Sequence, residues 1–239
     1  MNPEQRLEGG FLTDEVVQVG GTVRRTAGSH STFTAGILNY LHDAGFAAAP
    51  QYLGRDEQER DILEFIPGNI SERGNTIGRN ENSYAVAATL LRTMHDLTAG
   101  CALAGCEECV IHGDIGPFNT IFRDEVPVAF IDWDFCRPGQ RLSDVGYMAW
   151  QWCLLIGDTV EDEARRLSSL NAAYGLFTAE QLLDAMLKTQ EKNIAYTLQR
   201  LNLASNTQAR ESAEDALDWA RRCREHTQRH ADLYVTAMR

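Results

Sequence analysis

The segment Val110–Phe122, VIHGDIGPFNTIF, decides how this sequence is interpreted. Two short apolar runs flank a loop that contains His112, Asp114, Asn119, two glycines and a proline. Because proline cannot donate a backbone hydrogen bond, and the glycines favour turns, the composition argues against a regular helix between Asp114 and Asn119. We therefore predict a shaped loop between two short strands.

A second segment, AFIDWDF, follows closely and adds two carboxylates beyond an apolar run. The runs TIF and VAFID, joined by the turn RDEVP, are expected to pair, which would return Asp132 to the neighbourhood of Asn119. A carboxylate and a carboxamide oxygen, completed by water, suit a hard cation such as Mg²⁺. Asp114, on the same loop, is then the candidate catalytic group that takes a proton from a hydroxyl.

The first third of the chain is predicted to consist mainly of strands. Residues 15–26 form two β-rich runs joined by Gly20-Gly21, which is a two-residue hairpin signal. Residues 31–46 have apolar side chains at helical spacing, and 50–66 resemble a second hairpin that stops at Pro67-Gly68. Pairing across the first turn would set these residues opposite one another: Val19 and Thr22, Val17 and Arg24, Val16 and Arg25.

The composition changes after Gly68, where residues 69–80 are polar and contain glycine. We place a lobe boundary there, with an N-terminal lobe at 1–68 and a C-terminal lobe at 69–239. From residue 81 the chain is predicted to be mainly helical, apart from the two strands around the opening loop. The last part contains three amphipathic segments, at about 161–175, 178–203 and 208–238.

Composition narrows the class of protein. In 239 residues no apolar run approaches the roughly 20 needed to cross a bilayer, and the N-terminus has neither a basic nor an apolar signal region. We therefore expect no membrane partner and a cytoplasmic location, with the six cysteines kept as thiols. A net charge of −12 argues against nucleic acid and is compatible with a cationic small molecule. The oligomeric state is left open.

HGDIGPFN followed by IDWD resembles the catalytic loop and metal-binding aspartate of the aminoglycoside phosphotransferase and choline kinase family. With VRR near the start and Pro67-Gly68, the sequence is most similar to bacterial phosphotransferases grouped with trifolitoxin-immunity proteins. The resemblance implies a two-lobed, protein-kinase-like α+β fold that uses ATP and Mg²⁺ to phosphorylate a small-molecule hydroxyl. It assigns catalysis to Asp114, the metal to Asn119 and Asp132, and a bracing role to Asp144.

The resemblance also implies how the N-terminal lobe would hold the nucleotide. The segment ILEFIPG at 62–68 becomes the hinge between the lobes. Backbone groups near Glu64 and Ile66 would bind the adenine edge, with Leu63 behind it. The glycines of the first turn would approach the phosphates, and valines would cover the base; these residues are Gly9, Gly10, Val16 or Val17, and Val23.

Two departures from the family concern the phosphate-binding cation. The third strand, TVRRT, has no lysine, and the helix at 31–46 has no glutamate to pair with one. Strand alternation favours Arg25 as the replacement, and a shift by one residue would select Arg24. His30, His42 or Asp43 could replace the glutamate. Two functions therefore follow: a small-molecule kinase, or a catalytically weak nucleotide-binding, immunity or sequestration protein.

His112, Asp134 and the cysteines near residue 105 are not assigned a catalytic role. His112 is expected to be a packing and hydrogen-bonding residue of the loop, and Asp134 to assist the metal or to be structural. Cys101, Cys106 and Cys109 contain a CxxC pair, but no second pair has the spacing of a zinc site. We expect them to be thiols.

Overall fold

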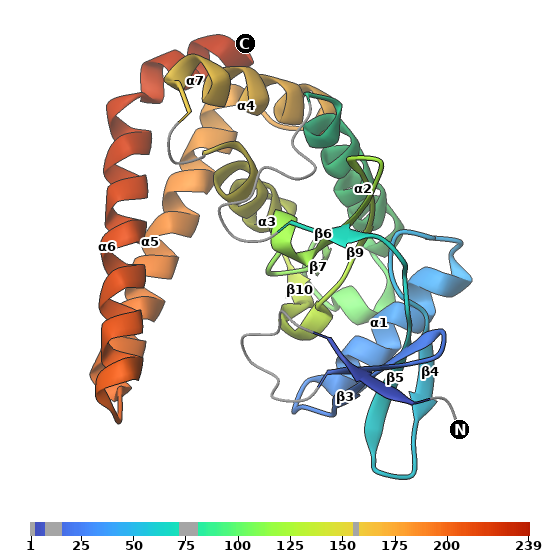
Figure 1. Ribbon diagram of the computed structural model, residues 1–239. Helices are drawn as coiled ribbons and strands as arrows, with labels where there is room; N and C mark the ends of the chain where they lie inside the picture. Colours follow the sequence, from blue (N-terminus) through green and yellow to red (C-terminus); the bar gives the residue numbers. More distant parts are fainter. Residues whose placement is uncertain (1–2, 8–15, 72–80, 155–157) are drawn as a thin grey trace. The chain divides into compact units, whose positions relative to one another are not determined.

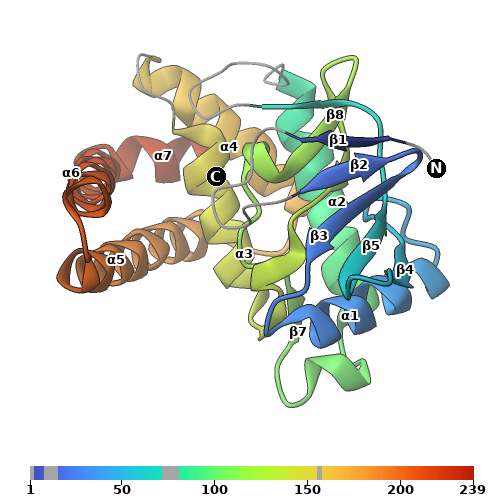
Figure 2. The same cartoon turned by 60° about the horizontal axis from the view of Figure 1, so that its bottom comes forward.

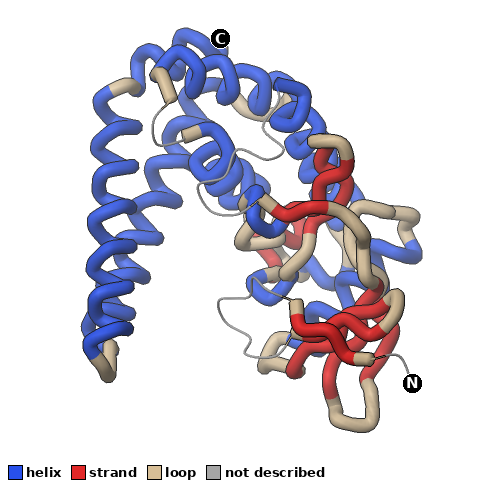
Figure 3. Tube along the Cα trace, viewed as in Figure 1, coloured by secondary structure: helices blue, strands red, loops and turns tan. Residues whose placement is uncertain are grey.

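The computed structural model describes residues 3–7, 16–71, 81–154 and 158–239. The fold class is α+β, as predicted, with antiparallel strands in the N-terminal part and a larger helical C-terminal part (Figure 3). The chain forms two compact units, Met1–Arg79 with Leu90–Gln140, and Asn80–Thr89 with Arg141–Arg239. The first unit contains the N-terminal sheet together with the opening loop and its strands.

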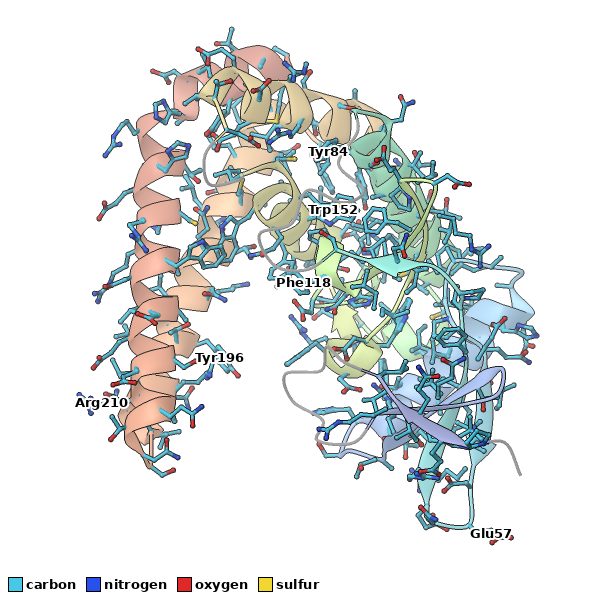
Figure 4. All side chains as sticks on the ribbon, viewed as in Figure 1. Glu57, Tyr84, Phe118, Trp152, Tyr196 and Arg210 are labelled. Atoms are coloured by element: carbon cyan, nitrogen blue, oxygen red, sulfur yellow. The ribbon has the colours of Figure 1, made fainter. Side chains whose placement is uncertain are left out.

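The N-terminal sheet has five antiparallel strands in the order β1-β2-β3-β5-β4 (Figure 2), of which Figure 1 labels β3, β5 and β4. The predicted first hairpin is confirmed, with Val17 paired to Arg24 and Val19 to Thr22, whereas Val16 precedes its strand. The second predicted hairpin is also confirmed, and Glu57 stands at its tip (Figure 4). The strand bounds are β1 (Glu4–Arg6), β2 (Val17–Val19), β3 (Thr22–Thr26), β4 (Tyr52–Arg55) and β5 (Arg60–Glu64).

One helix, α1 (Ser31–Asp43), accompanies this sheet and lies alongside β3, β5 and β4 (Figure 2). Its buried residues Ile37, Leu38 and Leu41 follow the predicted helical spacing. The chain leaves the helix through Gly45, whose φ of +78° is a backbone conformation that favours glycine. The apolar face of α1 is therefore part of the core of the first unit.

The rest of the first unit holds two small antiparallel sheets. One pairs β7 (Cys109–Ile111) with β10 (Arg137–Gly139), and the other has the order β6-β8-β9. The two strands predicted around RDEVP are confirmed as β8 and β9. The remaining bounds are β6 (Asn69–Ile70), β8 (Thr120–Arg123), β9 (Val126–Phe130), and the short 3₁₀ turns η1 (Ala102–Ala104), η2 (Pro117–Asn119) and η3 (Trp133–Phe135).

The second unit is helical. Thr159, Thr178 and Asn206 each accept a backbone N–H at a helix start, so their side chains fix three of the boundaries. Tyr84 packs edge-on against Trp152 at a centroid distance of 6.2 Å (Figure 4). The bounds are α2 (Glu81–Thr98), which begins here and continues in the first unit, α3 (Arg141–Met148), the π-helix η4 (Ala149–Cys153), α4 (Val160–Tyr174), α5 (Ala179–Leu203), α6 (Thr207–Arg229) and α7 (Ala231–Met238).

The amphipathic segment predicted at about 208–238 is divided at His230 into two helices, α6 and α7. The division lets Tyr234 of α7 donate to the buried carboxylate of Glu163 on α4 over 2.5 Å. His226 of α6 bonds to the same carboxylate oxygen at 2.7 Å. The helix division is therefore accompanied by tertiary hydrogen bonds that the periodic pattern does not show.

Across the described residues, no helix combines the length and the apolar character that spanning a membrane requires. The lobe boundary at residue 68 stays a prediction. The division into two compact units follows the packing of the chain and groups the strands and loops of 90–140 with the N-terminal sheet.

Candidate active site

The loop after β7 brings Asp114 and Asn119 together. The Asn119 Nδ2 atom donates to the Asp114 Oδ2 atom and to the Asp114 backbone oxygen, each at 2.9 Å. Pro117 starts the short turn η2, and the Asn119 amide donates to Gly116 O at 3.0 Å. The loop is therefore shaped as predicted, and Asn119 fixes the orientation of the Asp114 carboxylate.

His112 ties this loop to the end of β9. Its Nδ1 atom accepts from the Asp114 backbone N–H at 3.3 Å, so Nε2 carries the proton and donates to Ile131 O at 3.1 Å. The ring is fully buried and packs against Trp133 at a centroid distance of 4.8 Å. These contacts agree with the packing and hydrogen-bonding role that we predicted for His112.

Gly113 lets two backbone segments approach closely. Its φ is +84°, and a Cβ atom there would lie 2.4 Å from Phe135 O, a backbone atom that cannot move away alone. Only glycine satisfies both conditions. The residue between His112 and Asp114 therefore fixes the separation between the loop and the segment that follows β9.

Asp132 lies next to this loop, as the strand pairing predicted. The Ile131 N–H donates to Asn119 O at 2.9 Å, and Asp132 takes a left-handed conformation with φ 61° and ψ 66°. Its side chain is 46% exposed and can reach a ligand. Partial burial and the nearby Asp134 carboxylate raise the pKa of Asp132 above its ordinary value, although the Arg25 guanidinium acts in the opposite direction.

The two arginines of TVRRT point to opposite faces of the sheet. Arg25 is 7% exposed and forms ion pairs with Asp134 at 2.5 Å and with Asp132 at 3.8 Å. Arg24 instead pairs with Asp56 at 3.7 Å and donates to Thr22 Oγ1. Of the two alternatives left open by the sequence, the geometry brings Arg25 to the carboxylates and leaves Arg24 away from them.

None of the proposed substitutes for the missing glutamate faces Arg25. His30, His42 and Asp43 are all exposed, at or beyond the ends of α1. The acid that pairs with Arg25 most closely is Asp134, from the loop after β9. No sequence pattern links these two residues directly, and the second carboxylate of IDWD is the only local signal for the pairing.

The residues predicted to surround the base are partly exposed. Val23 and Leu63 are direct partners across β3 and β5, and both are half-buried, as are Val16 and Ile66. The Glu64 N–H donates to Gln51 O at 2.9 Å, so that donor is used within the protein. The remaining nucleotide-binding candidates, Gly9 and Gly10, lie outside the described residues.

The residues present fit a nucleotide with Mg²⁺. Because Asn119 uses Nδ2 for Asp114, its Oδ1 atom can face a cation together with the Asp132 carboxylate. The Arg25 Nε atom is a buried donor without a hydrogen-bond partner among the described residues, which suits a phosphate oxygen. In the described part of the chain no three His, Cys, Asp or Glu side chains form a metal cluster. Mg²⁺ is typically held by few carboxylates plus phosphates.

Asp144 and the cysteines are the remaining candidates from the sequence. Asp144 of α3 is buried, at 1% exposure, and its bracing role stays a prediction. All six cysteines are free. Cys109 is buried in β7 and Cys106 is exposed, so the two thiols of the CxxC pair lie in different environments.

Comparison with known proteins agrees with the motif. The family model described as the phosphotransferase enzyme family matches residues 98–184, which include the loop and IDWD. The trifolitoxin immunity protein of Rhizobium leguminosarum bv. trifolii is 28% identical over 233 residues, covering 91% of this chain and 87% of that protein. The predicted resemblance to the phosphotransferase family is confirmed.

Solved structures show the same fold at low sequence identity. A choline/ethanolamine kinase family protein from Mesorhizobium loti has a TM-score of 0.66 and 17% identity, covering 99% of this chain and 93% of that one. Spectinomycin phosphotransferase, in complex with ADP and spectinomycin, has a TM-score of 0.66 and 14% identity, covering 94% and 93%. The kinase-like α+β fold is therefore confirmed, and the phosphotransferase match supports a small-molecule kinase in general terms.

Proposed function

We propose that this protein is an ATP-dependent, Mg²⁺-assisted phosphotransferase that acts on a hydroxyl group of a small molecule. The observation that carries the proposal is the juxtaposition of Asp114 and Asn119 with Asp132 and a buried Arg25 in one compact unit. These are the residue types that phosphoryl transfer requires: a group that receives the hydroxyl proton, oxygen ligands for a cation, and a cation for the phosphates.

Asp114 would orient the acceptor hydroxyl and receive its proton. The hydrogen bond from Asn119 holds the carboxylate in one orientation, and the bond from the Asp114 N–H to His112 fixes the backbone beneath it. Because the transferred phosphoryl group needs little covalent assistance, most of the rate enhancement would come from this positioning and from charge neutralisation. A catalytic base of this kind contributes about 10²- to 10⁴-fold.

Asn119 and Asp132 would hold Mg²⁺ against the phosphates. A Mg²⁺ ion held by these two residues would supply positive charge to neutralise the phosphates. The raised pKa of Asp132 reflects partial burial and an adjacent carboxylate, and a divalent cation would offset both effects. Arg25 would supply the second positive charge, with its unused Nε–H directed to a phosphate oxygen.

The base would lie against the half-buried side chains of the N-terminal sheet, Val23 and Leu63, with Val16 nearby. Because the Glu64 N–H is used by Gln51, we assign the backbone contact to the adenine edge to the Ile66 end of the hinge segment. The net charge of −12 is compatible with a cationic acceptor, such as an amino sugar or another amine-bearing alcohol.

The test has two stages. Thermal unfolding with ATP, GTP and ADP, each with and without Mg²⁺, should show stabilisation by a nucleotide that depends on Mg²⁺. ATP consumption is then measured over a panel of hydroxyl compounds, including aminoglycosides, spectinomycin, macrolides and choline. Turnover with at least one acceptor is expected. Absence of nucleotide stabilisation would contradict the proposal.

A second candidate function is immunity or sequestration by nucleotide-dependent binding without efficient transfer. One observation favours it: the relative that covers 91% of this chain is a trifolitoxin immunity protein. The absence of lysine from TVRRT is consistent with weak transfer. Nucleotide stabilisation combined with no turnover on the whole panel would favour this second function.

A further inference from the structure

We propose that Asp134 is the positioning residue for Arg25, and that it keeps the guanidinium away from Asp132 so that Asp132 remains available for Mg²⁺. This inference rests on the proposed function of the same site. In the family that the sequence resembles, a glutamate on the helix after the third strand pairs with a lysine. Here the pairing acid comes from the loop after β9.

The ion-pair geometry around Arg25 is asymmetric. Its Nη2 atom lies 2.5 Å from Asp134 Oδ1, whereas Nη1 lies 3.8 Å from Asp132 Oδ1. The first distance is that of a close ion pair, and the second is beyond hydrogen-bond length. The Arg25 side chain is 9% exposed, whereas the Asp134 and Asp132 side chains are 37% and 46% exposed, so solvent reaches the carboxylates more than the guanidinium. Asp134 therefore holds the guanidinium and Asp132 is its secondary contact.

The α1 helix offers no equivalent acid. Its sequence, STFTAGILNYLHD, has one carboxylate, and this residue, Asp43, is exposed in the last turn. The inward position near the carboxylate loop is occupied by Thr34, whose hydroxyl donates to Trp133 O at 3.3 Å and lies 3.7 Å from Cys136 Sγ. Thr34 thus contacts the Trp133 backbone and the Cys136 side chain, and the pairing with Arg25 is left to Asp134.

The turn that carries Asp134 is firmly held. Trp133 is 1% exposed, and its indole N–H donates to Phe130 O at 3.0 Å. The Cys136 N–H closes the turn on Trp133 O at 3.2 Å. The backbone that carries Asp134 is therefore held in place, which lowers the conformational cost of presenting its carboxylate to Arg25.

Removal of the Asp134 carboxylate would change which carboxylate Arg25 pairs with. Asp132 would become the closest carboxylate known to contact Arg25, and the guanidinium would shift onto it. Arg25 would then compete with Mg²⁺ for the same oxygen atoms. The neutral variant Asp134→Asn should therefore require more Mg²⁺ for nucleotide binding, while a purely structural role for Asp134 would leave the Mg²⁺ requirement unchanged.

The first test measures ATP binding as a function of free Mg²⁺ for wild type, Asp134→Asn, Asp134→Glu and Asp43→Asn. Asp134→Asn should raise the half-saturating Mg²⁺ concentration about tenfold or more. Asp134→Glu should recover part of this loss, and Asp43→Asn, which removes the same charge from α1, should match wild type. Equal Mg²⁺ dependence of Asp134→Asn and wild type would overturn the inference, as would a shift caused by Asp43→Asn.

The second test needs no nucleotide and separates this inference from the proposed function. A double-mutant cycle with Arg25→Met and Asp134→Asn is followed by urea unfolding. The two changes should be non-additive, with a coupling of about fivefold or more in the unfolding equilibrium constant. Additive effects would overturn the pairing. If wild type binds no nucleotide yet the cycle shows coupling, the proposed function fails and the Arg25–Asp134 pairing survives.

Discussion

The side-chain amide of Asn119 donates to a carboxylate oxygen of Asp114 over 2.9 Å, across five positions of one loop. This bond links the residue assigned to proton transfer with a residue assigned to the cation. Since Nδ2 faces Asp114, the Asn119 Oδ1 atom is the one left for Mg²⁺. The relationship makes the roles of the two residues separable by mutation.

Replacing Asp114 with asparagine should reduce turnover while preserving nucleotide binding. The amide keeps the shape of the side chain and can still accept from Asn119, but it cannot take a proton. We expect turnover to fall about 10²- to 10⁴-fold, measured as ATP consumption with an acceptor found in the panel. Asp124→Asn is a matched control, because Asp124 is exposed with a φ of +49°, a conformation that asparagine accepts. Equal turnover of wild type and Asp114→Asn would remove Asp114 from the mechanism.

Replacing Gly113 with alanine should destabilise the first unit and its site together. A Cβ would lie 2.4 Å from Phe135 O at a φ of +84°, so the loop or the segment after β9 must move. We expect a loss of about 1–3 kcal/mol in the free energy of unfolding, measured by urea denaturation. Gly21→Ala is the control, since a Cβ at that position would meet nothing within 4 Å. A Gly113→Ala protein as stable as wild type would show that the loop can adjust freely.

Tyr234 should stabilise the packing of α7 against α4. Its hydroxyl donates to the buried Glu163 carboxylate, and Tyr234→Phe should cost about 1–3 kcal/mol of unfolding free energy near neutral pH. Burial, followed by the bond to Glu163, raises the pKa of Tyr234 above its ordinary value of 10.0. The folded protein therefore retains the phenol proton longer than the unfolded chain does.

The pH dependence of that effect has a definite sign. Below pH 10 both states are protonated and the contribution of Tyr234 is complete; above it the unfolded chain ionises first and the contribution falls. The difference in unfolding free energy between wild type and Tyr234→Phe should therefore shrink as the pH rises past about 10. A difference that grows with pH in that range would contradict the assignment.

Cysteine reactivity should differ sharply between two positions. Burial raises the pKa of the Cys136 thiol to about 11, so at pH 8 about one thiol in a thousand is ionised. Cys106 is exposed. Iodoacetamide followed by mass spectrometry should modify Cys106 and leave Cys136 unmodified in the folded protein, with Cys106→Ser as the control. Early modification of Cys136 would mean that its packing against Thr34 is not maintained.

Local sequence signals predicted much of the first unit. Gly20-Gly21 fixed a register in which Val17 pairs with Arg24, because a two-residue turn leaves little choice of pairing. The apolar spacing at residues 31–46 predicted α1, and the polar residues between β4 and β5 predicted the turn of the second hairpin. The proximity of Asp132 to Asn119 was predicted from the pairing of β8 with β9, which the structure contains.

What the sequence could not predict depends on contacts between distant segments. The pairing of Arg25 with Asp134 arises where β3 meets the loop after β9, and the family pattern directed attention to α1 instead. The division at His230 accompanies the hydrogen bond from Tyr234 to Glu163 on another helix, a contact that the helical pattern of 208–238 does not show. Asp132 has a positive φ in the folded turn. Aspartate can adopt this conformation, but its presence in a sequence does not predict it.

The most direct test of the proposed nucleotide site is isothermal titration calorimetry of ATP, with and without Mg²⁺, on wild type, Asp132→Ala and the control Asp124→Asn. Wild type and Asp124→Asn should bind ATP in a Mg²⁺-dependent manner, and Asp132→Ala should weaken that binding about tenfold or more. Mg²⁺-dependent binding of equal strength in Asp132→Ala, or no binding by wild type, would contradict the account.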